Sequence, residues 1–145
     1  MNDIWGFQQT LTLRLSIGAL VSILLGLAMF LIRTPLWNGI AIQFLAWGLI
    51  DLLIAQGGAL GTRKLRARLT VEQAALAAPQ EARKLARILW VNTVLDVFYM
   101  LGGVLTARFF GPSNPFWLGT GIGILLQGAF LFFFDWFHAL RVPRL

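Results

Sequence analysis

The sequence predicts an all-α integral membrane protein, a four-helix bundle. The chain has 145 residues, of which 58% are hydrophobic and only 12% are charged, and its mean hydropathy is +0.75. A soluble domain carries roughly 25% charged residues because water must wet its surface. Lipid is therefore expected to cover much of this chain. The number of long apolar runs and the placement of the basic residues point to the same class.

Four apolar runs are long enough to cross a bilayer, since a spanning helix needs about 20 mostly apolar residues. We expect spans at about residues 15–32, 37–60, 88–110 and 116–140, within a single membrane domain 1–145. The first run ends at Arg33, Thr34 and Pro35, and the third ends in the turn 111–115, which contains two prolines. No basic segment precedes the first run and no small-residue cleavage site follows it, so a signal peptide is not expected.

The one long connection, residues 61–87, is predicted to be a cytoplasmic loop. It holds most of the lysines and arginines: Arg63, Lys64, Arg66, Arg68, Arg83, Lys84 and Arg87. Cytoplasmic segments next to spans are enriched in basic residues, and Arg141 and Arg144 follow the last span. Both termini are therefore expected in the cytoplasm. The connection has no aromatic residue up to position 87, so the basic charge favours lipid headgroups over nucleic acid as a partner.

Two helix starts are predicted inside this connection. Thr70 and Gln73 fit a capping box ahead of an alanine-rich stretch, which indicates a short interfacial helix. Pro79 is tolerated in the first turn of a helix, so we expect a second, long helix over residues 79–110.

The two halves of the chain share short motifs. The segments 35–39 and 115–119 both fit P-[LF]-W-x-G, and the pattern Q-x7-D occurs at Gln43 with Asp51 and at Gln127 with Asp135. These matches predict two tandem helical hairpins in the same orientation, related by a pseudo-two-fold axis along the membrane normal. The polar positions are then expected to gather between the halves.

Three aspartates, Asp51, Asp96 and Asp135, lie inside predicted spans. An aspartate at the centre of a span costs about 2.5 to 3.5 kcal/mol on the insertion scale, so each needs a reason. Counting about 1.5 Å per residue from the outer turns places all three in one layer in the cytoplasmic half. Arg14 is expected to reach the same layer from the first span.

Polar and aromatic side chains share the helical faces of these acids. Asn92 and Tyr99 lie about one turn from Asp96, and Gln43 and Gln127 lie about two turns toward the outer side. We therefore expect a polar cavity between the helices. The candidate ligand- or ion-binding residues are Asp51, Asp96, Asp135, Asn92, Tyr99, Gln43, Gln127, Trp47, His138 and Arg14.

Two interpretations of the acid layer stay open. In the structural one, Arg14 pairs with one aspartate while the others are protonated or hydrogen-bonded and hold the bundle together. In the functional one, one arginine and at most one histidine cannot neutralise three aspartates, so an unpaired acid is protonated or binds a cation. A site completed by a partner subunit is a third alternative.

Small residues predict where helices approach closely. Gly18, Ser22 and Gly26 repeat every four residues in the first span, which fits either a homodimer seam or packing within one bundle. Gly102 and Gly103 in the third span fit a close crossing or a hinge.

Enzyme motifs are not found. The chain has no cysteine and a single histidine, so it cannot build a thiolate or multi-histidine metal centre. It has no P-loop and no nucleophile elbow. No catalytic residue, metal or cofactor is expected, and the sequence favours a protein without enzymatic activity while leaving the question undecided.

The third and fourth spans carry a resemblance. The pattern N-x3-D-x2-Y from Asn92 to Tyr99, the Gly102–Gly103 pair and the segment 127–135 resemble an uncharacterised bacterial family of small four-helix membrane proteins, known as a domain of unknown function. The resemblance implies the four-span fold and location in the bacterial inner (cytoplasmic) membrane. It implies no activity.

Two functions are compatible with these observations. The first is a small polytopic membrane protein whose acid-lined cavity binds or moves a proton, a cation or a small ligand. The second is a non-catalytic accessory or assembly subunit of a larger membrane complex. The lipid bilayer is the expected partner, and both a homodimer and a larger complex stay open.

Overall fold

The computed structural model describes residues 3–145, so the first two residues of the expected domain 1–145 lie outside the described residues. This part of the chain folds into helices α1 (Ile4–Phe30), α2 (Pro35–Arg68), α3 (Val71–Phe110) and α4 (Pro115–Ala139), with no strand among the described residues. Each helix is long and apolar enough to cross a membrane. The predicted all-α fold with four helices is confirmed.

Every helix begins at a side chain that caps it. The capping residues are Asp3, Thr34, Thr70 and Asn114, each of which accepts a backbone N–H from the first turn. Pro35 and Pro115 then start α2 and α4, where a missing N–H costs nothing. The two short turns lie where they were predicted, although Pro35 and Pro115, expected in the turns, are the first residues of α2 and α4. Helix α1 begins at Ile4, well before the predicted residue 15, because Asp3 caps it.

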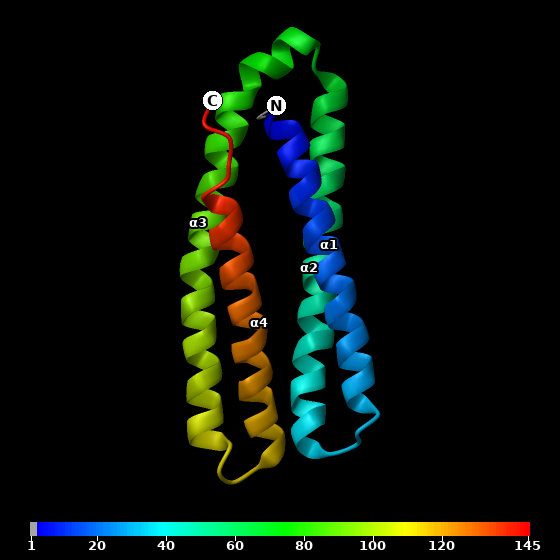
Figure 1. Ribbon diagram of the computed structural model, residues 1–145, viewed down its shortest axis with the longest axis vertical. Helices are drawn as coiled ribbons and strands as arrows, with labels where there is room; N and C mark the ends of the chain where they lie inside the picture. Colours follow the sequence, from blue (N-terminus) through cyan, green and yellow to red (C-terminus); the bar gives the residue numbers. More distant parts are fainter. Residues whose placement is uncertain (1–2) are drawn as a thin grey trace.

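The segment 61–87 is almost entirely helical. Helix α2 continues to Arg68 and α3 begins at Val71. The capping box of Thr70 and Gln73 forms as predicted, but the helix that it starts does not end before Pro79. The expected short helix and separate long helix are therefore one helix, which leans over toward α2 at the end where it begins (Figure 1). Such a bend is typical of an internal proline, which removes one backbone hydrogen bond.

Packing against α1 supports the first turns of α3. Ala74 and Ala82 of α3 bury Ile4 and Trp5 of α1, which are 0% and 7% exposed. The small alanine side chains allow close contact with these larger side chains.

The helices form two antiparallel hairpins, α1 with α2 and α3 with α4, and α2 packs against α4 to join them. Both termini lie at the same end of the molecule as the connection between α2 and α3 (Figure 1). The two short turns lie at the opposite end. We call these the connection end and the turn end.

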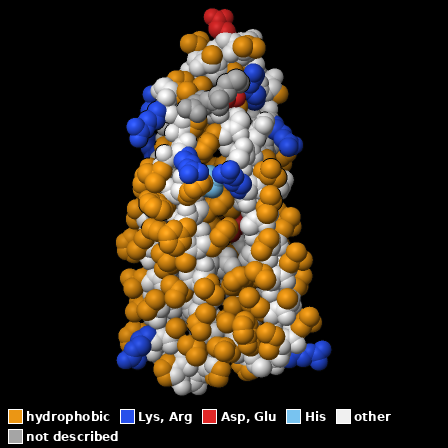
Figure 2. All heavy atoms as spheres, in the orientation of Figure 1, with side chains coloured by type: hydrophobic (Ala, Val, Ile, Leu, Met, Phe, Trp, Pro, Cys, Tyr) orange, Lys and Arg blue, Asp and Glu red, His pale blue; other side chains and the backbone are white. Residues whose placement is uncertain are grey.

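The surface matches this arrangement. Hydrophobic side chains cover most of the body of the molecule, and lysines and arginines gather toward the connection end (Figure 2). At about 1.5 Å per residue, the 34 residues of α2 and the 40 of α3 extend about 51 Å and 60 Å. Both lengths exceed the roughly 30 Å of a bilayer's hydrocarbon core. The parts of α2 and α3 nearest the connection end carry most of the lysines and arginines of the chain.

Helices α2 and α4 approach most closely at the two matching motifs. A Cβ atom on Gly39 would collide with the α4 backbone at Thr120, and one on Gly119 would collide with the α2 backbone at Leu36. Further along, a Cβ on Gly123 would meet the side chain of Gln43 at 2.8 Å. Glycine is therefore required here because the two backbones nearly touch.

The small-residue stripe of α1 packs within the bundle. A Cβ on Gly18 would meet Phe130 of α4, and one on Gly26 would meet Leu45 of α2. Ser22 donates a 2.8 Å hydrogen bond to the carbonyl of Phe44. Of the two alternatives that the sequence left open, the structure shows packing inside one chain.

Candidate functional site

Three aspartates from three helices line one cavity. Asp51 of α2, Asp96 of α3 and Asp135 of α4 are 3%, 8% and 7% exposed, and the cavity beside them measures about 300 Å³. We call it the acid cavity. Each of the four helices contributes to its lining: Leu15, Trp47, Asp51, Ile54, Asn92, Leu95, Asp96, Tyr99, Leu131 and Asp135.

The carboxyl groups are close enough for their charges to interact. Asp135 lies near both Asp96 and Asp51, and Asn92 lies beside Asp135. One buried oxygen of Asp51 and one of Asp96 have no hydrogen-bond partner within residues 3–145. Buried polar atoms normally have a partner. The acid cavity therefore has unused hydrogen-bonding capacity on acceptor oxygens.

An aromatic pair forms one wall of the cavity. The indole N–H of Trp47 donates to the hydroxyl of Tyr99, whose own proton goes to Oε1 of Gln43 at 3.3 Å. The two rings meet edge to face with centroids 4.8 Å apart. Gln43 thus holds Tyr99 in place from outside the cavity lining, and the chain of hydrogen bonds fixes both rings against the acids.

Gln127 lies elsewhere in the bundle and is 3% exposed. Its amide Nε2 donates to the hydroxyl of Ser22 at 3.0 Å, which links α4 to α1. Its Oε1 has no partner within the described part of the chain. Gln127 was predicted as a candidate binding residue, but it does not line the acid cavity. It hydrogen-bonds α4 to α1 instead.

Arg14 does not join the aspartates. Its guanidinium donates to Nε2 of His138 at 3.3 Å, while Nδ1 of His138 lies 2.7 Å from the carbonyl of Phe134. Nδ1 therefore carries the proton for that carbonyl, and Nε2 is free to accept from Arg14. The structural interpretation required an ion pair between Arg14 and an aspartate, and Arg14 forms this contact with His138 instead.

Arg14 and His138 belong to a separate cavity at the connection end. It measures about 350 Å³ and is also lined by Arg141, whose guanidinium lies 3.6 Å from the ring centroid of Phe137. His138 is 4% exposed and packs its ring against Phe134, 4.2 Å between centroids. Although His138 follows Asp135 by one turn, its side chain is directed into this second cavity.

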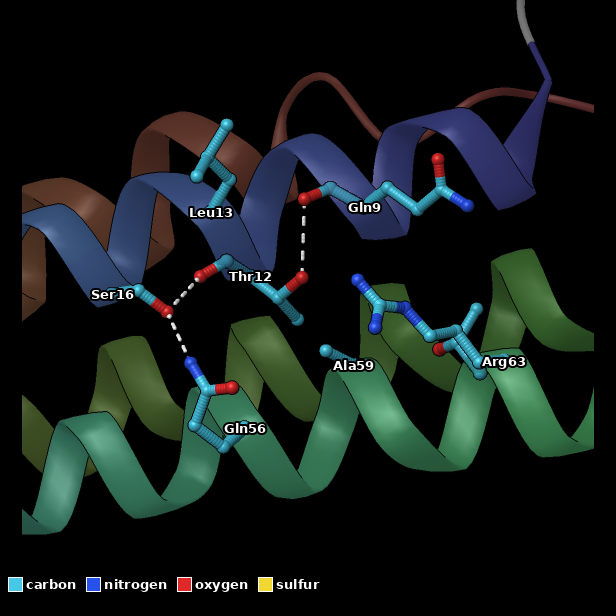
Figure 3. Close-up of a pocket in the computed structure, with 8 residues that line it drawn as sticks. Gln9, Thr12, Leu13, Ser16, Gln56, Ala59 and Arg63 are labelled. Carbon is cyan, nitrogen blue, oxygen red and sulfur yellow. Dashed lines mark hydrogen bonds between the residues drawn. The ribbon is translucent and has the colours of Figure 1, made fainter.

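A polar face between α1 and α2 was not predicted from the sequence (Figure 3). Gln56 donates to Ser16 at 3.1 Å, and Ser16 donates to the backbone of Thr12. Thr62 donates to Gln8 at 3.3 Å. The signal was present in the sequence, because Gln8, Thr12 and Ser16 recur every four residues and therefore share one helical face.

The described residues contain no group of three histidine, cysteine or acidic side chains placed to hold a metal ion. Together, the fold and the cavity define a class of small all-α proteins. Their four helices are long and apolar enough to cross a membrane, and aspartates line a cavity between them. The chain belongs to DUF6992, a family of unknown function, which it matches over residues 14–136. Searches of curated proteins and of solved structures found no match.

Proposed function

We propose that this chain is a multi-pass protein of the bacterial inner membrane whose acid cavity binds a small cation. The observation that carries the proposal is the sharing of one cavity by Asp51, Asp96 and Asp135, with two of their oxygens unpartnered. Arg14, the arginine of α1, is bonded to His138 and not to the aspartates. A bound cation would supply the positive charge that the acid cavity lacks.

The chemistry of the wall favours an organic ammonium group. A cation of that kind is attracted to the faces of Trp and Tyr rings as well as to carboxylates, and Trp47 and Tyr99 stand beside the acids. A volume of about 300 Å³ also suits a small organic cation. Protons compete for the same carboxylate oxygens, so binding should weaken as pH falls.

The distribution of charge supports the orientation. The connection end carries most of the basic residues in the long extensions of α2 and α3, and cytoplasmic segments are the basic ones. The proposed orientation has the connection end, with both termini, in the cytoplasm. Contact of Gly39 with α4 and of Gly119 with α2 supports the tandem repeat and its pseudo-two-fold axis.

Thermal unfolding in nanodiscs of neutral lipid tests the proposal. The probe is tetramethylammonium chloride, compared with sodium chloride at equal ionic strength. A ligand that binds only the folded state stabilises it by mass action, so the probe should raise the melting temperature of the parent chain.

The triple variant Asp51→Asn, Asp96→Asn, Asp135→Asn should lose this rise. The control Glu72→Gln removes an exposed carboxylate in the first turn of α3 and should keep it. A parent chain that gains nothing from the probe, or a triple variant that gains as much as the parent, contradicts a cation site. Either result favours the accessory-subunit role.

A further inference from the structure

We infer that a cation reaches the acid cavity from the connection end, through a crevice between α2 and α3. The inference rests on the proposed function, and it names the route to that site. It is carried by a difference in packing between the two ends of the bundle and by a second cavity aligned with the first.

Toward the turn end, glycines bring three pairs of helices into tight contact. A Cβ on Gly48 would lie 2.7 Å from the side chain of Ile23, and one on Gly128 would lie 2.7 Å from Met100. A Cβ on Gly103 would lie 2.8 Å from the carbonyl of Gly121. These contacts join α1 to α2 and α3 to α4, and the Gly39 and Gly119 contacts close α2 onto α4. On the turn side of the acids, α1–α2, α3–α4 and α2–α4 are therefore packed with no space between them.

Toward the connection end, α2 is open. A Cβ added to Gly57 or Gly61 would meet nothing within 4 Å in the part of the chain that the structure describes. The same atom on Gly58 would only touch the methyl group of Thr12 at 3.3 Å. The glycines on this side of the acids therefore leave space and do not create tight crossings.

A second cavity occupies that space. It measures about 320 Å³ and is lined by Gly58 and Gly61 of α2 and by Lys84 and Ile88 of α3. We call it the entry cavity. On α2, Ile54 of the acid cavity lies four residues from Gly58 of the entry cavity. On α3, Asn92 of the acid cavity lies four residues from Ile88 of the entry cavity. The two cavities are thus about 6 Å apart, one helical turn, along both helices.

An isoleucine from each helix lies at the boundary of the two cavities, because Ile54 lines the acid cavity and Ile88 lines the entry cavity. Ile54 and Ile88 are 58% and 47% exposed, so neither is locked in a packed core. A side chain with that freedom can change rotamer and open the route. Glu81 and Lys84, which line the entry cavity, carry opposite charges. The entry cavity therefore does not select for cations, and the aspartates of the acid cavity do.

A cysteine reporter in the acid cavity tests the route. The chain has no cysteine of its own, so Asn92→Cys provides a single thiol, and Leu15→Cys serves as a second reporter on another helix. The probe is a membrane-impermeant trimethylammonium-ethyl methanethiosulfonate, added to either side of oriented vesicles. The connection side is the side from which Lys64→Cys is labelled.

The reporter should react from the connection side only. Adding Gly61→Trp should slow the reaction several-fold, because the indole fills the entry cavity. The matched control Gly57→Trp is the same change at an equally open glycine of α2 that does not line that cavity, and it should leave the rate unchanged.

Faster reaction from the turn side, or no difference between the two tryptophan variants, overturns the inferred route. So does reaction with an uncharged, membrane-permeable thiol reagent alone, because it would indicate entry through the lipid. This measurement reports access to the cavity, whereas the tetramethylammonium melting experiment reports binding. A failure of one is therefore distinguishable from a failure of the other.

Discussion

At the scale of single residues, the buried aspartates differ in what holds them. Asp135 has Asn92 and Asp96 beside it as hydrogen-bonding neighbours, whereas one oxygen of Asp51 and the second oxygen of Asp96 have no partner within the described residues. An unsatisfied buried polar atom costs about 1–3 kcal/mol, so these two acids are destabilising unless another group reaches them. Such a cost is expected at a binding site and not at a purely structural contact.

Asp96→Asn should therefore keep the fold and lose the ligand. The amide retains hydrogen-bonding ability without the charge, so the variant should be as stable as the parent or more stable by up to about 3 kcal/mol, the insertion cost of a central aspartate. Unfolding in nanodiscs measures this. The rise in melting temperature with tetramethylammonium should be reduced or lost, and an undiminished rise would remove Asp96 from the site.

Arg14→Met tests whether the cavity of Arg14 and His138 is independent of the acid cavity. The change removes the donor to Nε2 of His138 and should lower the free energy of unfolding by about 1 kcal/mol. The response to tetramethylammonium should stay that of the parent, because Arg14 is bonded to His138 and not to the aspartates. Loss of the response to tetramethylammonium in this variant would show that Arg14 contributes to the site formed by the aspartates.

At the scale of helices, local signals predicted the starts of α2 and α4 to within two residues, but α1 starts at Ile4 and not near the predicted residue 15. Pro35 and Pro115, with the preceding Thr34 and Asn114, fix the first residues of α2 and α4. The continuity of α3 through Pro79 could not be predicted in the same way, because it depends on Ala74 and its neighbours meeting α1. Tertiary contacts of this kind have no local signature.

Matched glycine substitutions test the packing of α2 on α4. Gly119→Ala places a Cβ against the backbone of Leu36, and overpacking of this kind costs about 1–3 kcal/mol. Gly102→Ala, at a glycine of α3 with nothing within 4 Å among the described residues, should stabilise its helix by up to about 1 kcal/mol. Melting curves of the two variants should shift in opposite directions. Shifts of the same sign would contradict the close α2–α4 crossing.

At the scale of the whole molecule, the sequence predicted that the three aspartates lie together but did not predict the partner of Arg14. Periodicity and counting from the turns brought Asp51, Asp96 and Asp135 into one layer, and the structure places all three at one cavity. The same counting placed Arg14 at that depth, but depth does not determine direction around a helix axis. The rotation of α1 and α4 directs Arg14 and His138 toward each other.

Topology is predicted from the same layout. Single cysteines at Lys64 and Arg141 lie at the connection end, and one at Ser113 lies in a turn at the other end. In intact cells, an impermeant maleimide should label Ser113→Cys only, and the other two should label after the membrane is opened. Labelling of Lys64→Cys in intact cells would invert the proposed orientation.

Equilibrium dialysis of radiolabelled tetramethylammonium tests the central claim most directly. The claim is that the three aspartates form one cation site, so the parent chain in nanodiscs should retain the probe saturably, at one per chain, and release it as pH falls. The triple asparagine variant should retain none above the level of empty nanodiscs. Equal retention by the two proteins, or none by the parent, would contradict the claim.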